Sequence, residues 1–185
     1  MSASDAAPLT VGCCELDAAE IIARPGRREA LQSRHAGRLP ALQHAAVLGA
    51  LLGVSVRPDR WLLLGAPGAP ALAAALAPSA ADAVVLERGA GLRGLWVAGP
   101  AHRELLARGC RLDLGGDELA PNRAGATLIA QTPVTLLALA HGMLLLAPAS
   151  LAQHLHEWLL LSARALAPLT ERDVPFQQLT GESSR

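Results

Sequence analysis

The sequence predicts an α+β fold of two pseudo-repeated lobes, each combining mainly antiparallel strands with helices. Three observations lead to this prediction. Short apolar runs separated by turn residues are typical of strands in antiparallel sheets. Proline and serine mark the starts of a few helical segments between these runs. The order of elements in the first half of the 185 residues also returns in the second half, which favours an internal repeat.

The first lobe is predicted to cover residues 9–78, after a flexible N-terminus at residues 1–8. Apolar runs bounded by Pro, Gly and Asp favour strands, and Ala-rich segments that follow a proline favour helices. Pro58-Asp59-Arg60 is a predicted turn, because Pro and Asp favour turn geometry. The expected strands are residues 10–16, 19–24, 45–48, 53–57 and 61–64, and the expected helices are residues 27–36, ending at Gly37, and 70–76.

The second lobe is predicted to cover residues 81–168, so that residues 9–168 form one domain, followed by a polar tail at residues 169–185. Gly99-Pro100 predicts the start of one helix, since proline is tolerated in the first turn. Ser150 is the predicted N-cap of a second helix. The expected strands are residues 83–87, 92–97, 124–130, 134–140 and 143–147, and the expected helices are residues 101–107 and 150–168.

The apolar stretch from Thr127 to Pro148 is about long enough to span a bilayer. It contains Gln131 and Pro133, however, and His141-Gly142 is typical of a turn between two strands. We interpret the stretch as a buried hairpin and predict no membrane contact.

Two pairs of segments carry the internal repeat. Residues 22–31 match residues 97–106, where a strand leads through a proline into a helix. Residues 61–67 match residues 143–148, where an apolar strand leads into a closing helix. A composition rich in Ala and Leu is the alternative explanation of these matches.

Composition argues against several classes of partner. The net charge is zero, and aromatic residues make up only 2% of the chain. A protein with neither a basic field nor stacking residues is poorly suited to nucleic acid or to an anionic membrane. All basic residues are Arg, which, with the abundant Ala, Leu, Gly and Pro, is typical of a GC-rich bacterial genome.

The cysteines Cys13, Cys14 and Cys110 form no disulfide or zinc-binding pattern. We interpret them as buried thiols in a reducing compartment. No basic segment followed by an apolar run opens the chain, so no signal peptide is predicted, and a cytoplasmic location is expected.

The search for chemistry predicts no catalytic, cofactor-binding or metal-binding residue on this chain. His154 and His156 are two residues apart on a helix and point to different faces, which does not suit a metal pair. Ser33, Ser79 and Ser150 lack a nucleophile elbow. The remaining histidines are scattered through the sequence: His35, His44, His102 and His141.

A few charged and aromatic residues keep two interpretations. Asp113 either caps local backbone N–H groups or serves a binding site. The stripe formed by Arg27, Arg34 and Arg38 is either solvated or faces an acidic partner. The tryptophans, which fill a core or anchor an interface, are Trp61, Trp96 and Trp158.

Residues 95–114 read Leu-Trp-Val-Ala-Gly-Pro-Ala-His-Arg-Glu-Leu-Leu-Ala-Arg-Gly-Cys-Arg-Leu-Asp-Leu. This run, and Arg-Pro-Asp-Arg-Trp-Leu-Leu-Leu at residues 57–64, resemble segments of the gamma subunits of heterotetrameric sarcosine oxidases. The resemblance covers residues 10–167. The chain departs from the family pattern after Leu114, where Gly115-Gly116 lacks the usual Phe, and at Ala126-Thr127, which replaces an expected Arg-Thr pair.

The resemblance implies the folate-binding fold of the glycine-cleavage T-protein, that is, of an aminomethyltransferase. In folate-using relatives an acidic residue works near the folate amine, and Asp113 is the candidate for that role if it does not simply cap the local backbone. The resemblance further implies that FAD, FMN, NAD and tetrahydrofolate are bound by partner subunits and not by this chain. The expected partners are larger flavoprotein subunits of the alpha and beta type.

The resulting hypothesis is a non-catalytic accessory subunit of an oxidoreductase complex that demethylates an N-methyl amino acid. One alternative is a stand-alone tetrahydrofolate-binding or methyl-transfer protein of the same fold, which the scarcity of aromatic residues disfavours. An assembly factor for such a complex is a third possibility.

Overall fold

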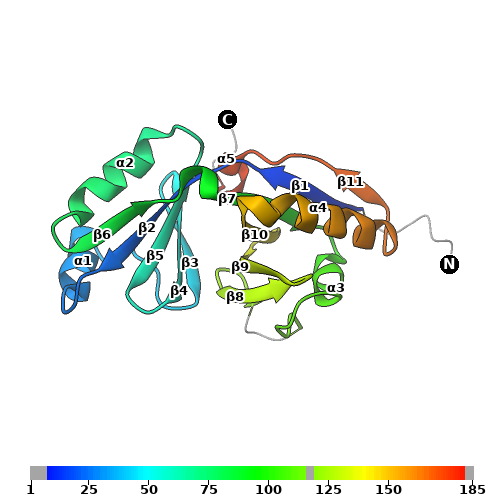
Figure 1. The fold of residues 1–185 in the computed structure, drawn as a ribbon, viewed down its shortest axis with the longest axis horizontal. Helices are drawn as coiled ribbons and strands as arrows, with labels where there is room; N and C mark the ends of the chain where they lie inside the picture. Colours follow the sequence, from blue (N-terminus) through cyan, green and yellow to red (C-terminus); the bar gives the residue numbers. More distant parts are fainter. Residues whose placement is uncertain (1–7, 116–118, 182–185) are drawn as a thin grey trace. The chain divides into compact units, whose positions relative to one another are not determined.

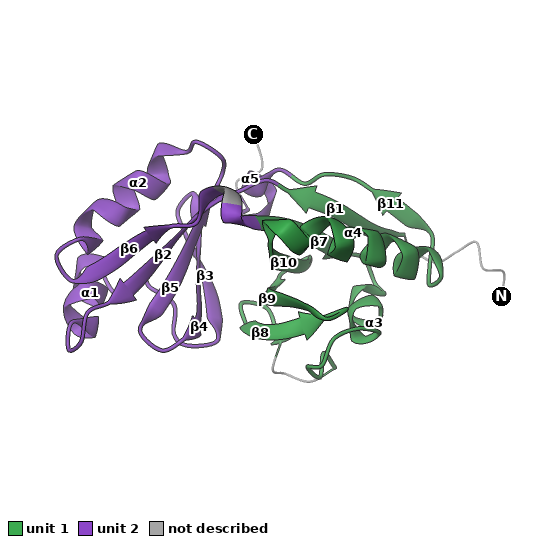
Figure 2. Cartoon of the chain, in the orientation of Figure 1, with its two compact units in different colours: residues 1–14, 93–174 green, residues 15–92, 175–185 purple. Residues whose placement is uncertain are grey.

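The computed structural model describes residues 8–115 and 119–181. The chain divides into two compact units, which Figure 2 shows in different colours. Unit 1 consists of residues 1–14 and 93–174, and unit 2 consists of residues 15–92 and 175–185. Each unit has its own mainly antiparallel sheet and its own helices, as predicted for an α+β fold (Figure 1).

Unit 2 has a five-stranded sheet in the order β3-β4-β5-β2-β6. All four pairs of neighbouring strands are antiparallel. The strands are β2 (Asp17–Ala23), β3 (His44–Leu48), β4 (Leu51–Arg57), β5 (Arg60–Gly65) and β6 (Ala83–Glu87). The helices are α1 (Arg28–Arg34), α2 (Pro70–Leu76), α5 (Phe176–Leu179) and the short 3-10 helices η1 (Ala77–Ser79) and η2 (Gly89–Gly91).

Helices α1 and α2 cover one face of this sheet. Alternate strand residues point to the same face, so Ile21, Trp61 and Leu63 form the floor of the core there. Leu31 of α1 is buried against them, and Leu72 of α2 packs on the same cluster. The buried indole N–H of Trp61 donates to the carbonyl oxygen of Pro40 at 2.9 Å, which satisfies its only polar group.

Unit 1 has a six-stranded sheet in the order β11-β1-β7-β10-β9-β8. Strand β1 pairs in parallel with β11 and antiparallel with β7, and β9 pairs antiparallel with β8 and β10. The strands are β1 (Leu9–Cys14), β7 (Leu92–Ala98), β8 (Ala124–Ile129), β9 (Thr132–Leu139), β10 (Gly142–Pro148) and β11 (Leu169–Glu171). The helices are α3 (His102–Ala107) and α4 (Ala149–Arg164).

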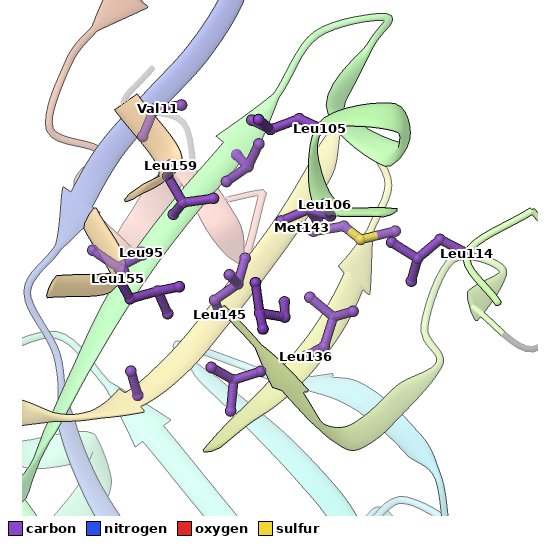
Figure 3. Packing of buried hydrophobic residues seen from close by; sticks show 14 of the residues in the cluster. Val11, Leu95, Leu105, Leu106, Leu114, Leu136, Met143, Leu145, Leu155 and Leu159 are labelled. Carbon is purple, nitrogen blue, oxygen red and sulfur yellow. The ribbon is translucent and has the colours of Figure 1, made fainter. Parts of the chain in front are cut away.

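The core of unit 1 lies between one face of its sheet and helices α3 and α4. Figure 3 shows Leu105 and Leu106 of α3 and Leu155 and Leu159 of α4 directed at the strands. Helical spacing in the sequence predicts that Leu155, Trp158, Leu159 and Leu166 share this face, and all four pack on the core. Leu151 was expected on the same face, but it is 39% exposed. Strand residues such as Met143 complete the cluster.

The two sheets repeat one topology. In each unit a strand leads into a short helix, then three antiparallel strands follow, then a second helix and a last strand. The order β3-β4-β5-β2-β6 corresponds to β8-β9-β10-β7-β11, with β1 inserted between β7 and β11. Segments 22–31 and 97–106 are the equivalent strand-to-helix passages, so the structure bears out the internal repeat.

The first strand does not lie where the predicted lobe boundaries, 9–78 and 81–168, put it. Strand β1 belongs to unit 1, where Val11 is paired with Val97 and both are fully buried. Only Glu15 and Leu16 separate β1 from β2, and this short link suggested a single lobe. Strand pairing across more than 80 residues leaves no local mark in the sequence.

The described part of the predicted polar tail (residues 169–185), residues 169–181, forms a strand and a helix. Leu169–Glu171 form β11, and Phe176–Leu179 form α5, in which Phe176 is 2% exposed. Its apolar side chains Val174, Phe176 and Leu179 are buried, although most residues of the segment are polar. The predicted flexible N-terminus falls on residues 1–8, of which residues 1–7 lie outside the described part of the chain.

Most other predicted elements agree with the structure within a few residues. The buried hairpin is confirmed, with Gly142 opposite Leu139 in the β9–β10 pair. The cap of α4 was wrong, because the helix begins at Ala149 after Pro148 and Ser150 makes no capping hydrogen bond. Among the described residues, no helix is long and apolar enough to cross a membrane.

Candidate functional site at the end of helix α1

A buried carboxylate in unit 2 binds two arginines. Arg27 is the N-cap residue of α1 and Arg34 is its last residue, so the two are seven residues apart and lie on one side of the helix. The side chain of Asp82, just before β6, is 0% exposed and forms ion pairs with both guanidinium groups. The Nε–H of Arg27 donates to Asp82 Oδ1 at 2.7 Å, and the Nε–H of Arg34 donates to Oδ2.

These contacts fix the charge of Asp82. The hydrogen bond from Arg34, together with the hydrogen bond and positive charge of Arg27, lowers the pKa of Asp82 below its ordinary value and outweighs the opposing effect of burial. The carboxylate therefore stays ionised at neutral pH. It ties α1 to the loop that precedes β6, so the pairing shapes the end of the helix.

Next to this cluster, His35 Nε2 lies 2.8 Å from the hydroxyl oxygen of Ser79 in η1. A serine beside a histidine is also the arrangement of a nucleophile and its base. Ser79 is fully buried, however, so its oxygen cannot reach a substrate and the contact is structural. Partial burial lowers the pKa of His35, because desolvation disfavours the imidazolium form.

A cavity of about 320 Å³ opens beside these residues. One side is polar and basic, and it comes from the last residue of α1 and the loop that follows. The other side is apolar and comes from β3, β4, β5 and α2. The lining residues are Arg34, His35, Ala36, Arg38, Leu48, Leu51, Leu63 and Ala75.

The backbone after α1 brings Arg38 to the cavity. Ala36 and Gly37 have φ angles of 52° and 68°, in the left-handed region. Glycine adopts this region without steric strain because it has no Cβ atom, whereas alanine is uncommon there. The N–H of Gly37 donates to Gln32 O at 2.8 Å and that of Arg38 to His35 O at 3.0 Å, which holds the turn. Two basic side chains, four residues apart, therefore border one opening.

The arginine stripe predicted from the sequence is thus only partly solvated. Arg27 and Arg34 pair with Asp82, and Arg38 lines the cavity. The sequence analysis missed Asp82 because it lies in an Ala-rich segment with no motif around it. Two arginines at helical spacing followed by an isolated acidic residue are a possible signal, but the pairing across 48 residues is visible only in the structure.

Asp113 caps the backbone locally. Its Oδ1 accepts a hydrogen bond from the N–H of Gly115 at 2.8 Å, and its side chain is exposed. Nearby, Arg103 donates to the carbonyl oxygens of Leu114 and Leu119, the latter at 2.7 Å, and so ties the loop to α3. The capping interpretation therefore accounts for Asp113.

Two of the tryptophans pack in cores. Trp61 is buried in the core of unit 2, and Trp158 packs partly buried on the core of unit 1. Trp96 on β7 is 8% exposed and is not part of the core cluster that contains Leu95 and Val97. The histidines are not brought together, and His154 and His156 differ in exposure on α4. Across residues 8–115 and 119–181, no group of three or more His, Cys, Asp or Glu side chains is arranged to hold a metal ion.

No protein-family model matches the chain, and no curated protein matches it. The structure is similar to a chain of the heterotetrameric sarcosine oxidase from Corynebacterium sp. U-96, with 25% identity and a TM-score of 0.74. That similarity covers 85% of this chain and 84% of the other.

The structure is also similar to the glycine cleavage system aminomethyltransferase T from Bartonella henselae, with 17% identity and a TM-score of 0.65. This similarity covers 90% of the present chain but only 48% of the aminomethyltransferase, so the chain spans about half of the length of that enzyme. The chain therefore has the α+β fold of the superfamily that includes aminomethyltransferase T and this sarcosine oxidase chain.

Proposed function

We propose that this chain is the gamma-type, non-catalytic subunit of a flavin-dependent amine oxidoreductase complex related to sarcosine oxidase. The complex would demethylate an N-methyl amino acid by oxidation. FAD, FMN, NAD and tetrahydrofolate would be bound by larger alpha- and beta-type flavoprotein subunits, and the whole complex would be cytoplasmic.

The observation that carries the proposal is the mutual coverage of the sarcosine oxidase chain. The similarity takes in more than four fifths of both chains. Aminomethyltransferase T, by contrast, contains about as much chain again beyond the similar part. The fuller coverage of the sarcosine oxidase chain supports a subunit of that kind.

Exposed apolar side chains on unit 2 support a role in assembly. Val84 and Leu86 of β6 are 44% and 41% exposed and alternate with Ala83 and Val85, so they share one face of the sheet. Their partners in register are Ile22 and Glu20, which places them on the face that α1 and α2 do not cover. Strand β6 is also an edge strand, and apolar edges of this kind favour contact with another chain.

Co-purification is the direct test. The chain is tagged and expressed together with the two large flavoprotein reading frames of its native host, and the purified material is assayed for flavin content and sarcosine oxidation. The proposal expects a stable complex in which all flavin is on the larger subunits. A chain that stays monodisperse alone and binds tetrahydrofolate would contradict it and favour the stand-alone folate-binding protein.

A pair of matched variants locates the contact. The double variant V84E/L86E places two charges on β6, and L151E/L161E does the same on α4, where Leu161 is 70% exposed. If β6 contacts a partner, the first variant loses the complex while the second keeps it. Retention of the complex by both variants would show that neither apolar surface is used.

A further inference from the structure

We propose that the cavity at the end of α1 binds a small monocarboxylate with a compact apolar body. This inference goes beyond the proposed function, since it concerns a site on the chain itself and needs no partner subunit. The cavity volume of about 320 Å³ is at the lower end of the range of roughly 300–1,000 Å³ that is usual for small-molecule sites.

The charges around the cavity favour an anion. None of its lining residues is acidic, whereas two are arginines. Asp82 carries one negative charge against the two positive charges of Arg27 and Arg34, so their cluster keeps a net positive charge. Arg38 adds a second positive charge at the same opening.

The donors are partly held in place before any ligand arrives. Arg34 donates to Asp82 through Nε, which leaves the terminal NH₂ groups of its fork on a side chain that is 44% exposed. A guanidinium group matches the two oxygens of a carboxylate, and a restrained fork loses less freedom on binding. Asp82 therefore acts as a positioning residue for Arg34.

The opposite wall selects for an apolar body. Leu48, Leu51 and Leu63 belong to three adjacent strands, and Ala75 of α2 closes the side. Burying the body of a ligand against these side chains is favourable, and a hydrated inorganic anion gains nothing from them. The two walls together recognise a molecule with one charged end and one apolar end.

Hydrogen–deuterium exchange with mass spectrometry tests the site, with 4-methylpentanoate as the probe. We expect saturable slowing of exchange in peptides that cover residues 34–51 and 70–80, and no change in peptides from residues 124–148. The measurement works at low concentration on the isolated chain and equally on an assembled complex. Its result is therefore separable from the success or failure of the proposed function.

Two further probes separate the contributions of charge and apolar body. The neutral 4-methylpentanamide should bind about tenfold more weakly or worse, because it lacks charge-assisted hydrogen bonds to arginine. Inorganic phosphate should also bind about tenfold more weakly, because it lacks the apolar body. Equal protection by the amide or by phosphate would overturn the proposal.

Variants complete the test. R38Q should weaken binding of 4-methylpentanoate by about tenfold through loss of a charged donor, and A75L should weaken it by filling the cavity. The matched controls are R57Q and A74L, which change exposed residues outside the lining and should bind as the parent does. Absence of saturable protection in the parent chain, or equal binding by R38Q and R57Q, would show that the cavity is not a carboxylate site.

Discussion

The two units differ in what packs at the end of their first helix, which is α3 in unit 1 and α1 in unit 2. In unit 1, α4 has 16 residues, and Trp158 in its third turn packs against Gly109, just after α3. A Cβ atom on Gly109 would lie 2.7 Å from the indole ring, so the space there is full. In unit 2, α2 has only 7 residues and ends at Leu76, and a cavity lies beyond the end of α1.

The two units therefore differ in the length of their second helix, which has 16 residues in unit 1 and 7 in unit 2, where it borders the cavity. The strands that carry both helix pairs are equivalent in order, so the sheet does not account for the difference. Helix α3 packs against α4, whereas α1 contacts the short helix η1. With less helix above it, the end of α1 is held by ion pairs to Asp82 instead of by a large aromatic side chain.

The largest expected effect is on the filled side of this comparison. Replacing Trp158 by Ala removes the side chain that covers Gly109 and should lower the free energy of unfolding by about 3 kcal/mol. The control is L161A on the same helix, where the side chain is 70% exposed and the change should stay within about 0.5 kcal/mol. Urea denaturation measures both, and equal losses would show that Trp158 is not a packing anchor.

In unit 2, the ion pairs of Asp82 with Arg27 and Arg34 hold α1 in place, where unit 1 uses the side chain of Trp158. D82N removes the negative charge that Arg27 and Arg34 share and should destabilise the chain more than D59N does. Asp59 pairs with Arg28 at 2.8 Å in an exposed setting, where an ion pair contributes less than about 1 kcal/mol. Similar stabilities of the two variants would contradict this role for Asp82.

The same carboxylate predicts acid sensitivity. Because the pKa of Asp82 is lowered in the folded chain, the unfolded chain binds the proton more readily. The stability from Asp82 is present above the unfolded pKa of about 4 and is lost as pH falls through the lower folded value. Unfolding midpoints measured from pH 7 to pH 2 should fall less in D82N than in the parent, and parallel curves would argue against it.

Filling the cavity should have a smaller effect of opposite sign. A75L adds apolar atoms where α2 borders the opening and should raise the free energy of unfolding by about 0.5–1 kcal/mol. A74L, at an exposed position of the same helix, is the control and should change little. Destabilisation by A75L alone would mean that the cavity is too narrow for the added side chain.

The smallest expected effect concerns His35. Its pKa is lowered by burial, so the unfolded chain takes up a proton at higher pH than the folded chain does. Stability should therefore decline as pH falls below about 6.5, until the folded pKa is passed. H35Q should lack this part of the pH dependence when its unfolding midpoint is measured in urea at several pH values from 8 to 5. The same pH dependence of the midpoint in H35Q and the parent would rule out His35 as the source.

Local sequence signals located most elements. Prolines and glycines marked the start of α2, the end of β6 and the turn of the β9–β10 hairpin, because these residues constrain the backbone directly. The repeated passage from strand through proline to helix was also visible in the sequence, and the two sheets repeat the same order. These features depend on residues that are neighbours along the chain.

Features that depend on distant partners were not predictable. The pairing of Val11 with Val97 and the ion pair between Arg34 and Asp82 join residues that share no motif. The residues that line the cavity come from α1 and the loop after it, from β3, β4 and β5, and from α2, so no local pattern in the sequence predicts it. Asp113 was interpretable because its partner, Gly115, is two residues away.

The chain passes between its units after residues 14, 92 and 174, so neither unit is a continuous segment. During synthesis, the first strand leaves the ribosome long before β7, which it flanks in the finished sheet. All five strands of the unit 2 sheet are synthesised before β7, so this sheet can form before β1 has its partner β7. A fragment that starts at residue 15 would deprive unit 1 of an internal strand, and cutting the gene near residue 80 would divide neither unit cleanly from the other.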